Sequence, residues 1–379
     1  MRERKFPNIF LRILIFIYVN QECNVHWNTK FSENFKVKNG VRQGAILSQS
    51  HFSLYIDSLL IQLENSGYGC HINNYFYGCS GYADDIILLS PTRNGLQSMF
   101  NLCVKYFKEH KITISTNTDL AKSKTKCIYF SHTKSKVKPA PIMMNNTPLP
   151  WVDSWPHLGI ELFNENLTIK AGSNMDKDLD MKRTKFIGKY HALFQEFGFS
   201  TPETLFKLIS IYATSCYGSV LWDLSGAAAE HLYRSWNILI RSIWKLPNTS
   251  HRYFIEEVSD SSHIKTILSQ RCLTFFHSLV TSKKKCLSEL AKKMIMDQGS
   301  KSGRNLNYIS INSGFERHNI MTFHPATVAN AMKYCPVPED CLGKVSFVKE
   351  LIKVQNGELE TSNFSREEIQ DMIQLITTD

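Results

Sequence analysis

Two adjacent aspartates, Asp84 and Asp85, separate two apolar stretches, and this feature constrains the fold more than any other in the chain. The flanking residues, 72–77 and 86–89, are rich in the aromatic and branched side chains that strands favour. A β-hairpin over 70–90 is therefore predicted, with both carboxylates near its tip. Adjacent like charges cost free energy, and Mg²⁺ relieves that cost because it prefers one or two carboxylates with substrate phosphates. The alternative to a metal site is an ordinary solvated turn. Two adjacent aspartates without any further motif favour this alternative.

The segments around the hairpin carry alternating helical and strand patterns. The helices that apolar spacing predicts are 7–20, 47–66 and 94–110, and the further strands are 24–38, 112–114 and 127–130. This order of elements predicts an α+β fold with an antiparallel sheet, in a first domain that spans 1–165.

The remainder of the chain has a different pattern. From about residue 175 the spacing is helical almost throughout, which predicts a helical region over 175–295 and a C-terminal helical tail over 318–379. Four prolines and several lysines in 131–150 predict an exposed connection, and the polar, Gly/Ser/Asn-rich stretch 296–317 predicts a loop.

Charge and cysteine content restrict the class of protein. The chain has 44 Lys and Arg against 34 Asp and Glu, a net charge of +10, which fits either a nucleic-acid partner or a merely basic protein equally well. Its ten cysteines form no C-x-x-C pair, which favours reduced thiols over a disulfide framework or a zinc site. The apolar run 9–19 is interrupted by Arg12 and is too short to span a bilayer, so no membrane partner is expected.

Four motifs follow one another in the chain. The sequence Tyr82-Ala83-Asp84-Asp85 resembles the Y-A-D-D box of reverse transcriptases, especially those of non-LTR retrotransposons and group II introns. Residues 40–48 resemble the Q-G-x-x-L-S motif of the same enzymes, and 51–59 continue the match. Downstream, 124–130 resemble the motif whose lysine approaches the leaving pyrophosphate, and 155–160 resemble the H-L-G turn that grips the primer. The order of the motifs identifies the chain as similar to a non-LTR retrotransposon reverse transcriptase.

That resemblance implies a palm, followed by an α-helical thumb and C-terminal region, in an RNA-directed DNA polymerase that takes an RNA template, a DNA primer and dNTPs. It implies Asp84 and Asp85 as catalytic ligands of Mg²⁺ or Mn²⁺, Arg42, Gln43, Gly44 and Tyr82 at the template and nucleotide, and His157, Leu158 and Gly159 as the primer grip. Lys124 would act as a general acid or electrostatic partner for pyrophosphate. A solvated lysine, flanked by Lys122 and Lys126, is an equal alternative.

The sequence departs from the family in one important respect. Such enzymes need another metal-binding aspartate in a strand well before the Q-G motif, but the first aspartate here is Asp57. The earlier carboxylates, Glu3, Glu22 and Glu33, are not in a suitable strand. We therefore expect a chain truncated at its N-terminus relative to the family and without autonomous polymerase activity.

Two other functions remain open at this stage. The chain could be an inert remnant that still binds nucleic acid through the basic stretch 182–189, although such a stretch is more often a solvated face. It could instead be a structural or interaction protein that uses its helical half. Residues 1–38 are expected to expose an apolar patch and to lower solubility. The reduced cysteines and the family resemblance imply residence in the nucleus or cytoplasm, and the oligomeric state is not indicated.

Overall fold

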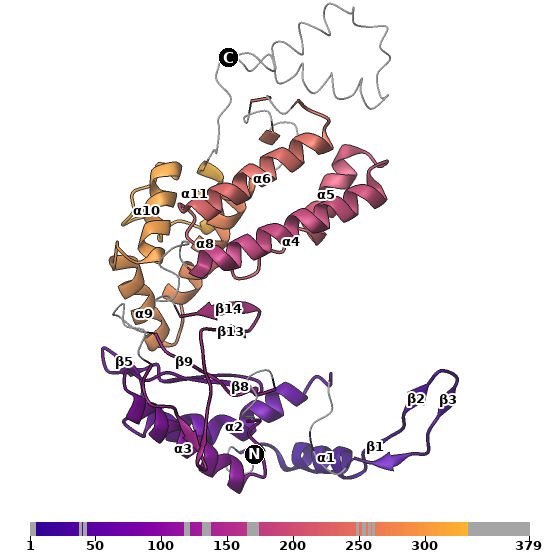
Figure 1. Ribbon diagram of the computed structural model, residues 1–379, viewed down its shortest axis with the longest axis vertical. Helices are drawn as coiled ribbons and strands as arrows, with labels where there is room; N and C mark the ends of the chain where they lie inside the picture. Colours follow the sequence, from indigo (N-terminus) through magenta and orange to yellow (C-terminus); the bar gives the residue numbers. More distant parts are fainter. Residues whose placement is uncertain are drawn as a thin grey trace, which may run out of the picture. The chain divides into compact units, whose positions relative to one another are not determined.

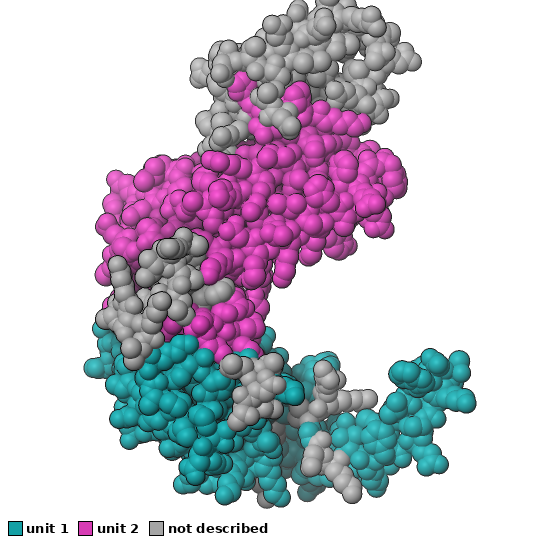
Figure 2. All heavy atoms as spheres, viewed as in Figure 1, with its two compact units in different colours: residues 1–127, 138–151 teal, residues 128–137, 152–379 magenta. Residues whose placement is uncertain are grey.

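The computed structural model describes residues 5–37, 40, 44–116, 122–130, 138–164, 174–247, 250–251, 255–256, 259 and 262–332. The chain divides into two compact units, which Figure 2 distinguishes by colour. The first unit contains Met1–Cys127 and Lys138–Trp151, and the second contains Ile128–Val137 and Val152–Asp379. The described residues form helices and small two-stranded antiparallel sheets, consistent with the predicted α+β class.

The first unit begins with an amphiphilic segment whose apolar side chains are exposed. Helix α1 (Asn8–Val19) is followed by a ribbon in which β1 (Glu22–Cys23) pairs with β4 (Phe35–Lys36) and β2 (His26–Trp27) pairs with β3 (Lys30–Phe31). Figure 1 shows this ribbon extending from the end of α1. Trp27 is 77% exposed, and several α1 side chains are more than half exposed. The apolar patch expected for 1–38 is therefore present.

Two helices form the core of the first unit. Helix α2 (Ser48–Glu64) packs against α3 (Arg93–Glu109), and the buried side chains Leu59, Leu63 and Met99 meet at the contact. Thr92 caps α3, because its Oγ1 accepts a hydrogen bond from the amide of Gly95 at 3.1 Å. Both helices lie within two residues of their predicted bounds.

The predicted single hairpin over 70–90 is instead two hairpins. Strand β5 (His71–Ile72) pairs with β6 (Tyr75–Phe76), and β7 (Cys79–Tyr82) pairs with β8 (Asp85–Leu88). The extra turn is Asn73-Asn74, whose φ values of 47° and 63° match a type I′ turn. Asparagine tolerates this left-handed conformation, so the two asparagines were the signal that the prediction of one hairpin overlooked.

The segment from 112 to 150 departs from prediction at two places. Residues 112–116 form no strand, so the strand predicted at 112–114 is wrong, whereas β9 (Cys127–Ile128) is present and pairs with β12 (Trp151–Val152). The predicted exposed connection contains a hairpin of β10 (Met143–Met144) and β11 (Thr147–Pro148), and it buries Ile142 and Leu149 against α3. Residues 131–137 of that connection lie outside the described part.

Polar contacts to α3 explain why this hairpin is packed down. Gln97 Oε1 accepts from the amide of Met143 at 2.8 Å, and Gln97 Nε2 donates to the carbonyl of Met143 at 2.9 Å. Arg93 Nη2 also donates to the carbonyl of Pro141 at 2.7 Å. These bonds satisfy backbone groups that burial of the hairpin would otherwise leave without partners.

The second unit is mostly helical, as the pattern after residue 175 predicted. Its elements are β13 (Ser154–His157), β14 (Ile160–Phe163), α4 (Asn174–Phe197), α5 (Pro202–Tyr212), the short 3-10 helix η2 (Ser219–Leu221), α6 (Ala227–Ile243), α8 (Ile264–Val280), α9 (Lys285–Met296), α10 (Lys301–Ser313) and α11 (Pro325–Ala331). Figure 1 shows α4 and α6 running side by side. Together with α5 they form a buried aromatic core that includes Phe186, Phe206 and Trp236. The β13–β14 hairpin also belongs to this unit.

Helix α10 corrects the loop predicted over 296–317. Ser300 caps it by accepting from the amide of Gly303 at 3.0 Å, and Gly314 ends it in a left-handed conformation with φ 74°. Leu306 and Ile309 lie on its fully buried face. The domain boundaries predicted at 165 and 175 stay predictions, and most of the predicted tail, 333–379, lies outside the described part.

Candidate active site and nucleic-acid interface

The two aspartates lie at the tip of the β7–β8 hairpin. Tyr82 pairs with Asp85, so Ala83 and Asp84 are the two turn residues. Ala83 has φ 51° whereas Asp84 has a negative φ, which is the pattern of signs of a type II′ turn. Glycine is the usual residue at the first position of this turn, so Ala83 is held in a strained conformation. Both carboxylates are exposed, and Tyr82 is 57% exposed beside them.

The rest of the hairpin is fixed on the core of the first unit. Ile86 and Leu88 on β8 pack on the cluster formed by α2 and α3. On β7, a Cβ placed at Gly81 would lie 3.5 Å from Cδ1 of Ile56 in α2, so this face of the strand is already in van der Waals contact with the helix. The apolar strands therefore hold a tip that presents two carboxylates to solvent.

This pair of carboxylates has the donor chemistry for a divalent cation. Hard oxygen ligands suit Mg²⁺, which commonly uses one or two carboxylates and completes its coordination with substrate phosphates and water. Within the described residues, no group of three or more Asp, Glu, His or Cys side chains could hold a metal ion. Asp84 and Asp85 therefore fit such an ion only as part of its ligand set.

The other residues predicted for the polymerase site are placed less completely. Arg42 and Gln43 lie outside the described part of the chain, and Gly44 is left-handed with φ 79° just before α2. Lys124 is exposed in a short segment after residue 121, where Ser123 Oγ donates to the carbonyl of Thr125 at 2.8 Å. No contact between Lys124 and the aspartates is present among the described residues, so its role stays a prediction.

The predicted primer grip is the turn between β13 and β14. His157 pairs with Ile160, and Leu158 and Gly159 have φ values of 48° and 77°, which form a type I′ turn. This turn packs on the second unit's own helices: Lys182 Nζ on α4 donates to the carbonyl of Gly159 at 3.2 Å. His157 is half-buried, whereas Leu158 and Gly159 are exposed.

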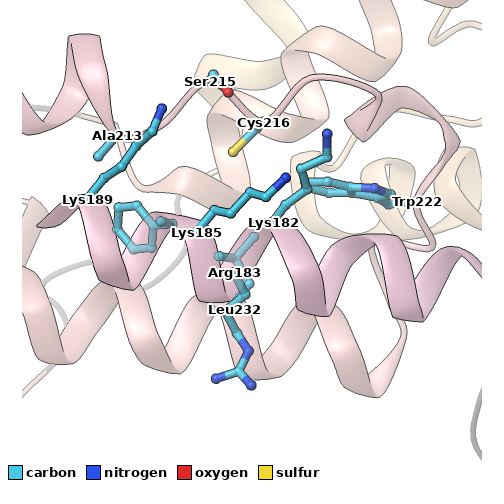
Figure 3. Close-up of a pocket in the computed structure, with 10 residues that line it drawn as sticks. Lys182, Arg183, Lys185, Lys189, Ala213, Ser215, Cys216, Trp222 and Leu232 are labelled. Carbon is cyan, nitrogen blue, oxygen red and sulfur yellow. The ribbon is translucent and has the colours of Figure 1, made fainter. Parts of the chain in front are cut away.

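A basic pocket of about 190 Å³ adjoins this turn on α4. The residues that line it are Lys182, Arg183, Lys185, Phe186, Lys189, Ala213, Ser215, Cys216, Trp222 and Leu232. Figure 3 shows the ammonium groups of Lys182, Lys185 and Lys189 on one side of α4, whereas the guanidinium of Arg183 points the other way. Arg183 is paired with Asp180 through a 3.4 Å contact. Three lysines of the basic stretch singled out in the sequence thus share one face.

The opposite wall of the pocket was not found from the sequence. It comes from the segment between α5 and η2, where Ser215 and Cys216 face the lysines. Burial raises the pKa of the Cys216 thiol, and the nearby charges of Arg271 and Lys182 offset part of this rise. The wall could not have been recognised in advance, because nothing in the pattern of 213–222 indicates which helix face it covers.

Comparison with known proteins bears on both sites. Residues 2–162 match the family described as reverse transcriptase (RNA-dependent DNA polymerase). The chain is 26% identical over 186 residues to the "Retrovirus-related Pol polyprotein from type-1 retrotransposable element R2" of Nasonia vitripennis, and 28% identical over 158 residues to the corresponding polyprotein of the "type-2 retrotransposable element R2DM" of Drosophila melanogaster. Residues 2–162 are thus a reverse transcriptase domain that is similar to those of non-LTR retrotransposons.

The matches cover limited parts of the proteins. They include 47% and 40% of this chain but only 18% and 14% of the two relatives, so the chain corresponds to a small part of each polyprotein. Reverse transcriptase domains use divalent metal ions and act on a nucleic-acid template and primer with nucleotide substrates. Among the described residues, no helix is both long and apolar enough to cross a membrane. The eight cysteines in the described part form no disulfide bond with one another.

Proposed function

We propose that this reverse transcriptase domain is the palm of an RNA-directed DNA polymerase, with the helical unit acting as its thumb. The observation that carries the proposal is the β7–β8 tip, where Asp84 and Asp85 are exposed side by side on strands packed into a core. A divalent ion held there would supply Lewis-acid stabilisation of charge on the transferring phosphoryl group. The rigid hairpin contributes by fixing both carboxylates before substrate arrives, so that their ordering is not required during the reaction.

Other residues take positioning roles in this proposal. In this proposal Gly44, which lies just before α2, contacts the template and nucleotide together with Arg42, Gln43 and Tyr82. Lys124 neutralises the leaving pyrophosphate. The turn at His157, Leu158 and Gly159 holds the primer end, and α4 approaches the backbone of the duplex. The RNA template, DNA primer and dNTPs are the partners that these roles require.

We expect little polymerase activity from this chain alone. Two-metal transfer needs ligands besides Asp84 and Asp85, and the described residues bring no third metal-binding side chain to them. A second candidate function is therefore binding of nucleic acid without catalysis. The specific observation that favours it is the lysine pocket on α4, which is formed within the second unit and does not depend on the aspartates.

The deciding experiment is Mg²⁺- or Mn²⁺-dependent extension of a DNA primer on an RNA template by the purified chain. Asp84→Asn removes one metal-binding charge, and Glu109→Gln serves as the control because it removes an exposed carboxylate at the end of α3. Primer–template binding is measured in parallel by fluorescence anisotropy.

Three outcomes separate the candidate functions. Extension that disappears in Asp84→Asn but persists in Glu109→Gln identifies an active polymerase. Binding without extension, unchanged in both variants, identifies a nucleic-acid-binding protein. Neither binding nor extension would overturn both proposals and favour a structural or interaction role.

A further inference from the structure

Lys182 takes part in two features of the second unit at once. Its Nζ donates to the carbonyl of Gly159 at 3.2 Å and lies 5.8 Å from the centroid of the Tyr217 ring. The same side chain lines the basic pocket beside Lys185. All of these residues belong to one compact unit, so the relationship is internal to it. A single cation thus connects the β13–β14 turn to the pocket.

The turn is held tightly at this point. A Cβ placed at Gly159 would lie 3.2 Å from Cε1 of Tyr217, and one at Gly218 would lie 3.1 Å from Cγ1 of Ile160. The two segments therefore touch through glycines, and each glycine also has a positive φ that other residues rarely adopt. Lys182 adds the polar contact to this packing. The position of the turn depends on the side chains at 182 and 217.

The pocket favours an anion. Lys182, Lys185 and Lys189 share one face, and Lys189 Nζ donates to the carbonyl of Tyr212 at the end of α5, 3.1 Å away. No acidic side chain lines the pocket in the part of the chain that the structure describes. Like charges gathered on one face repel one another, and a bound anion relieves that repulsion.

One residue of the pocket lining limits which part of a polynucleotide the pocket can hold. Trp222 lies there with its side chain fully buried, and its Nε1 donates to Oδ2 of Asp178 at 2.9 Å. A buried indole presents no open face on which a nucleobase could stack. The pocket therefore matches the phosphate of a polynucleotide and not its base, and lysine is a point-charge donor suited to a single phosphate.

We propose that one backbone phosphate of the bound nucleic acid occupies this pocket and that Lys182 is a positioning residue that couples it to the β13–β14 turn. The inference rests on the proposed function, because it assumes a polynucleotide ligand. The ammonium group has three N–H donors, so Lys182 can donate to the carbonyl of Gly159 and to a phosphate at the same time. Binding of the phosphate then stabilises the turn, and by linkage an ordered turn strengthens binding.

Two kinds of measurement test the proposal on the full chain. The first is the salt dependence of affinity for a fluorescent RNA–DNA primer–template hairpin. The second is hydrogen exchange of the amides in 154–163, with and without the bound RNA–DNA primer–template. The variants are Lys185→Ala, Lys182→Ala, Lys182→Arg and Tyr217→Ala. Lys207→Ala is the matched control, because Lys207 is an exposed lysine on α5 that does not line the pocket.

The expected results differ between the variants. Lys185→Ala should weaken binding several-fold and lower the slope of log affinity against log salt by about one, as loss of one phosphate contact does. The variant should leave hydrogen exchange in the free chain unchanged. It should remove the extra protection that the bound primer–template confers on the amides of 154–163. Lys182→Ala and Tyr217→Ala should raise exchange there even without ligand. Lys182→Arg should restore protection, and Lys207→Ala should resemble the parent chain in every measurement.

Failure of this proposal can be distinguished from failure of the proposed function on which it rests. Suppose that Lys185→Ala binds the primer–template with the same salt slope and the same gain in protection as the parent chain. This result would overturn the phosphate site in the pocket but not the proposal that the chain binds nucleic acid. If the parent chain does not bind the primer–template, the proposed function is overturned. In that case hydrogen exchange is measured during a titration with inorganic pyrophosphate. If pyrophosphate adds no protection to the amides of 154–163, the proposal that the pocket binds a phosphate is overturned as well. Unchanged exchange across α6 in every variant checks that the fold is preserved.

Discussion

The indole Nε1 of Trp222 donates to Oδ2 of Asp178 at 2.9 Å, and both side chains are almost completely buried. The other carboxylate oxygen, Oδ1, has no hydrogen-bond partner within the described part of the chain. The backbone carbonyl of Trp222 accepts from Nδ2 of Asn305 at 2.7 Å. Trp222 therefore ties α4 to α10 through polar bonds that the core encloses.

Replacing this carboxylate should reveal how much the buried pair contributes. Asp178→Ala removes the acceptor of the buried indole, and we expect the free energy of unfolding to fall by about 1–3 kcal/mol, the usual cost of an orphaned buried polar group. Asp178→Asn keeps an acceptor and removes a buried charge, so its loss should be smaller or absent. Urea unfolding followed by circular dichroism measures both values. Equal losses in the two variants would mean that the charge itself, and not the hydrogen bond, provides the stabilisation.

The strained turn at Ala83 gives a second prediction. A β-branched side chain is rarely tolerated at a positive φ, so Ala83→Val should destabilise the β7–β8 hairpin by about 1–3 kcal/mol. Ala83→Gly should relieve the strain and leave stability near that of the parent chain, because glycine also gains freedom in the unfolded state. Hydrogen exchange of 79–88 reports the local effect. Equal protection in the Val and Gly variants would contradict a type II′ conformation.

The hairpin tip was the part of the site that could be predicted best from sequence. Adjacent strands and turns are determined by residues close in the chain, so Asp84 and Asp85 could be placed at a tip without knowing the rest of the fold. The helices α2 and α3 followed equally directly, because their apolar spacing continues over several turns.

Features that depend on distant contacts were not predictable in the same way. The pocket combines lysines of α4 with Ser215 and Cys216, and only the packing of the helices brings these segments together. The β10–β11 hairpin was expected to be exposed because its composition is rich in proline and lysine, yet Gln97 and Arg93 hold it against α3. Tertiary contacts overrode local composition in both cases.

Helix α10 shows the same effect and can be tested directly. A Cβ at Gly303 would lie 2.0 Å from the carbonyl oxygen of Asp297, so Gly303→Ala requires the backbone at the start of the helix to move. Ser300→Ala removes the cap, which typically stabilises by about 1 kcal/mol, together with the hydrogen bonds that Ser300 Oγ donates to the carbonyls of Asp297 and Met294. We expect Gly303→Ala to lower the free energy of unfolding by clearly more than Ser300→Ala in urea titrations. Gly314→Ala is a useful comparison, because its Cβ would meet open space and only the positive φ would oppose it.

The Asp223–Arg304 pair predicts a dependence of stability on acid. Arg304 Nε and Nη2 donate to Oδ2 of Asp223 at 3.0 and 2.8 Å. Burial raises the pKa of Asp223, but hydrogen bonds from Ser225 and Arg304 outweigh it, so the folded pKa lies below the ordinary value. The stabilisation is then fully present above the pKa of the unfolded chain, near 4. It is lost as the pH falls from there through the folded pKa.

We therefore expect the parent chain to lose more stability than Asp223→Asn as the pH is lowered from about 5 to 3, since the amide does not titrate. Ser225→Ala should lie between them, because it removes the bond from Ser225 Oγ to Asp223 Oδ1 (2.7 Å) and leaves the arginine in place. Ser288→Ala, at a partly exposed position on α9, is the control and should follow the parent chain. Urea midpoints measured at closely spaced pH values provide the test. Parallel curves for the parent chain and Asp223→Asn would mean that the pair's contribution is screened by solvent, as it is for most surface salt bridges.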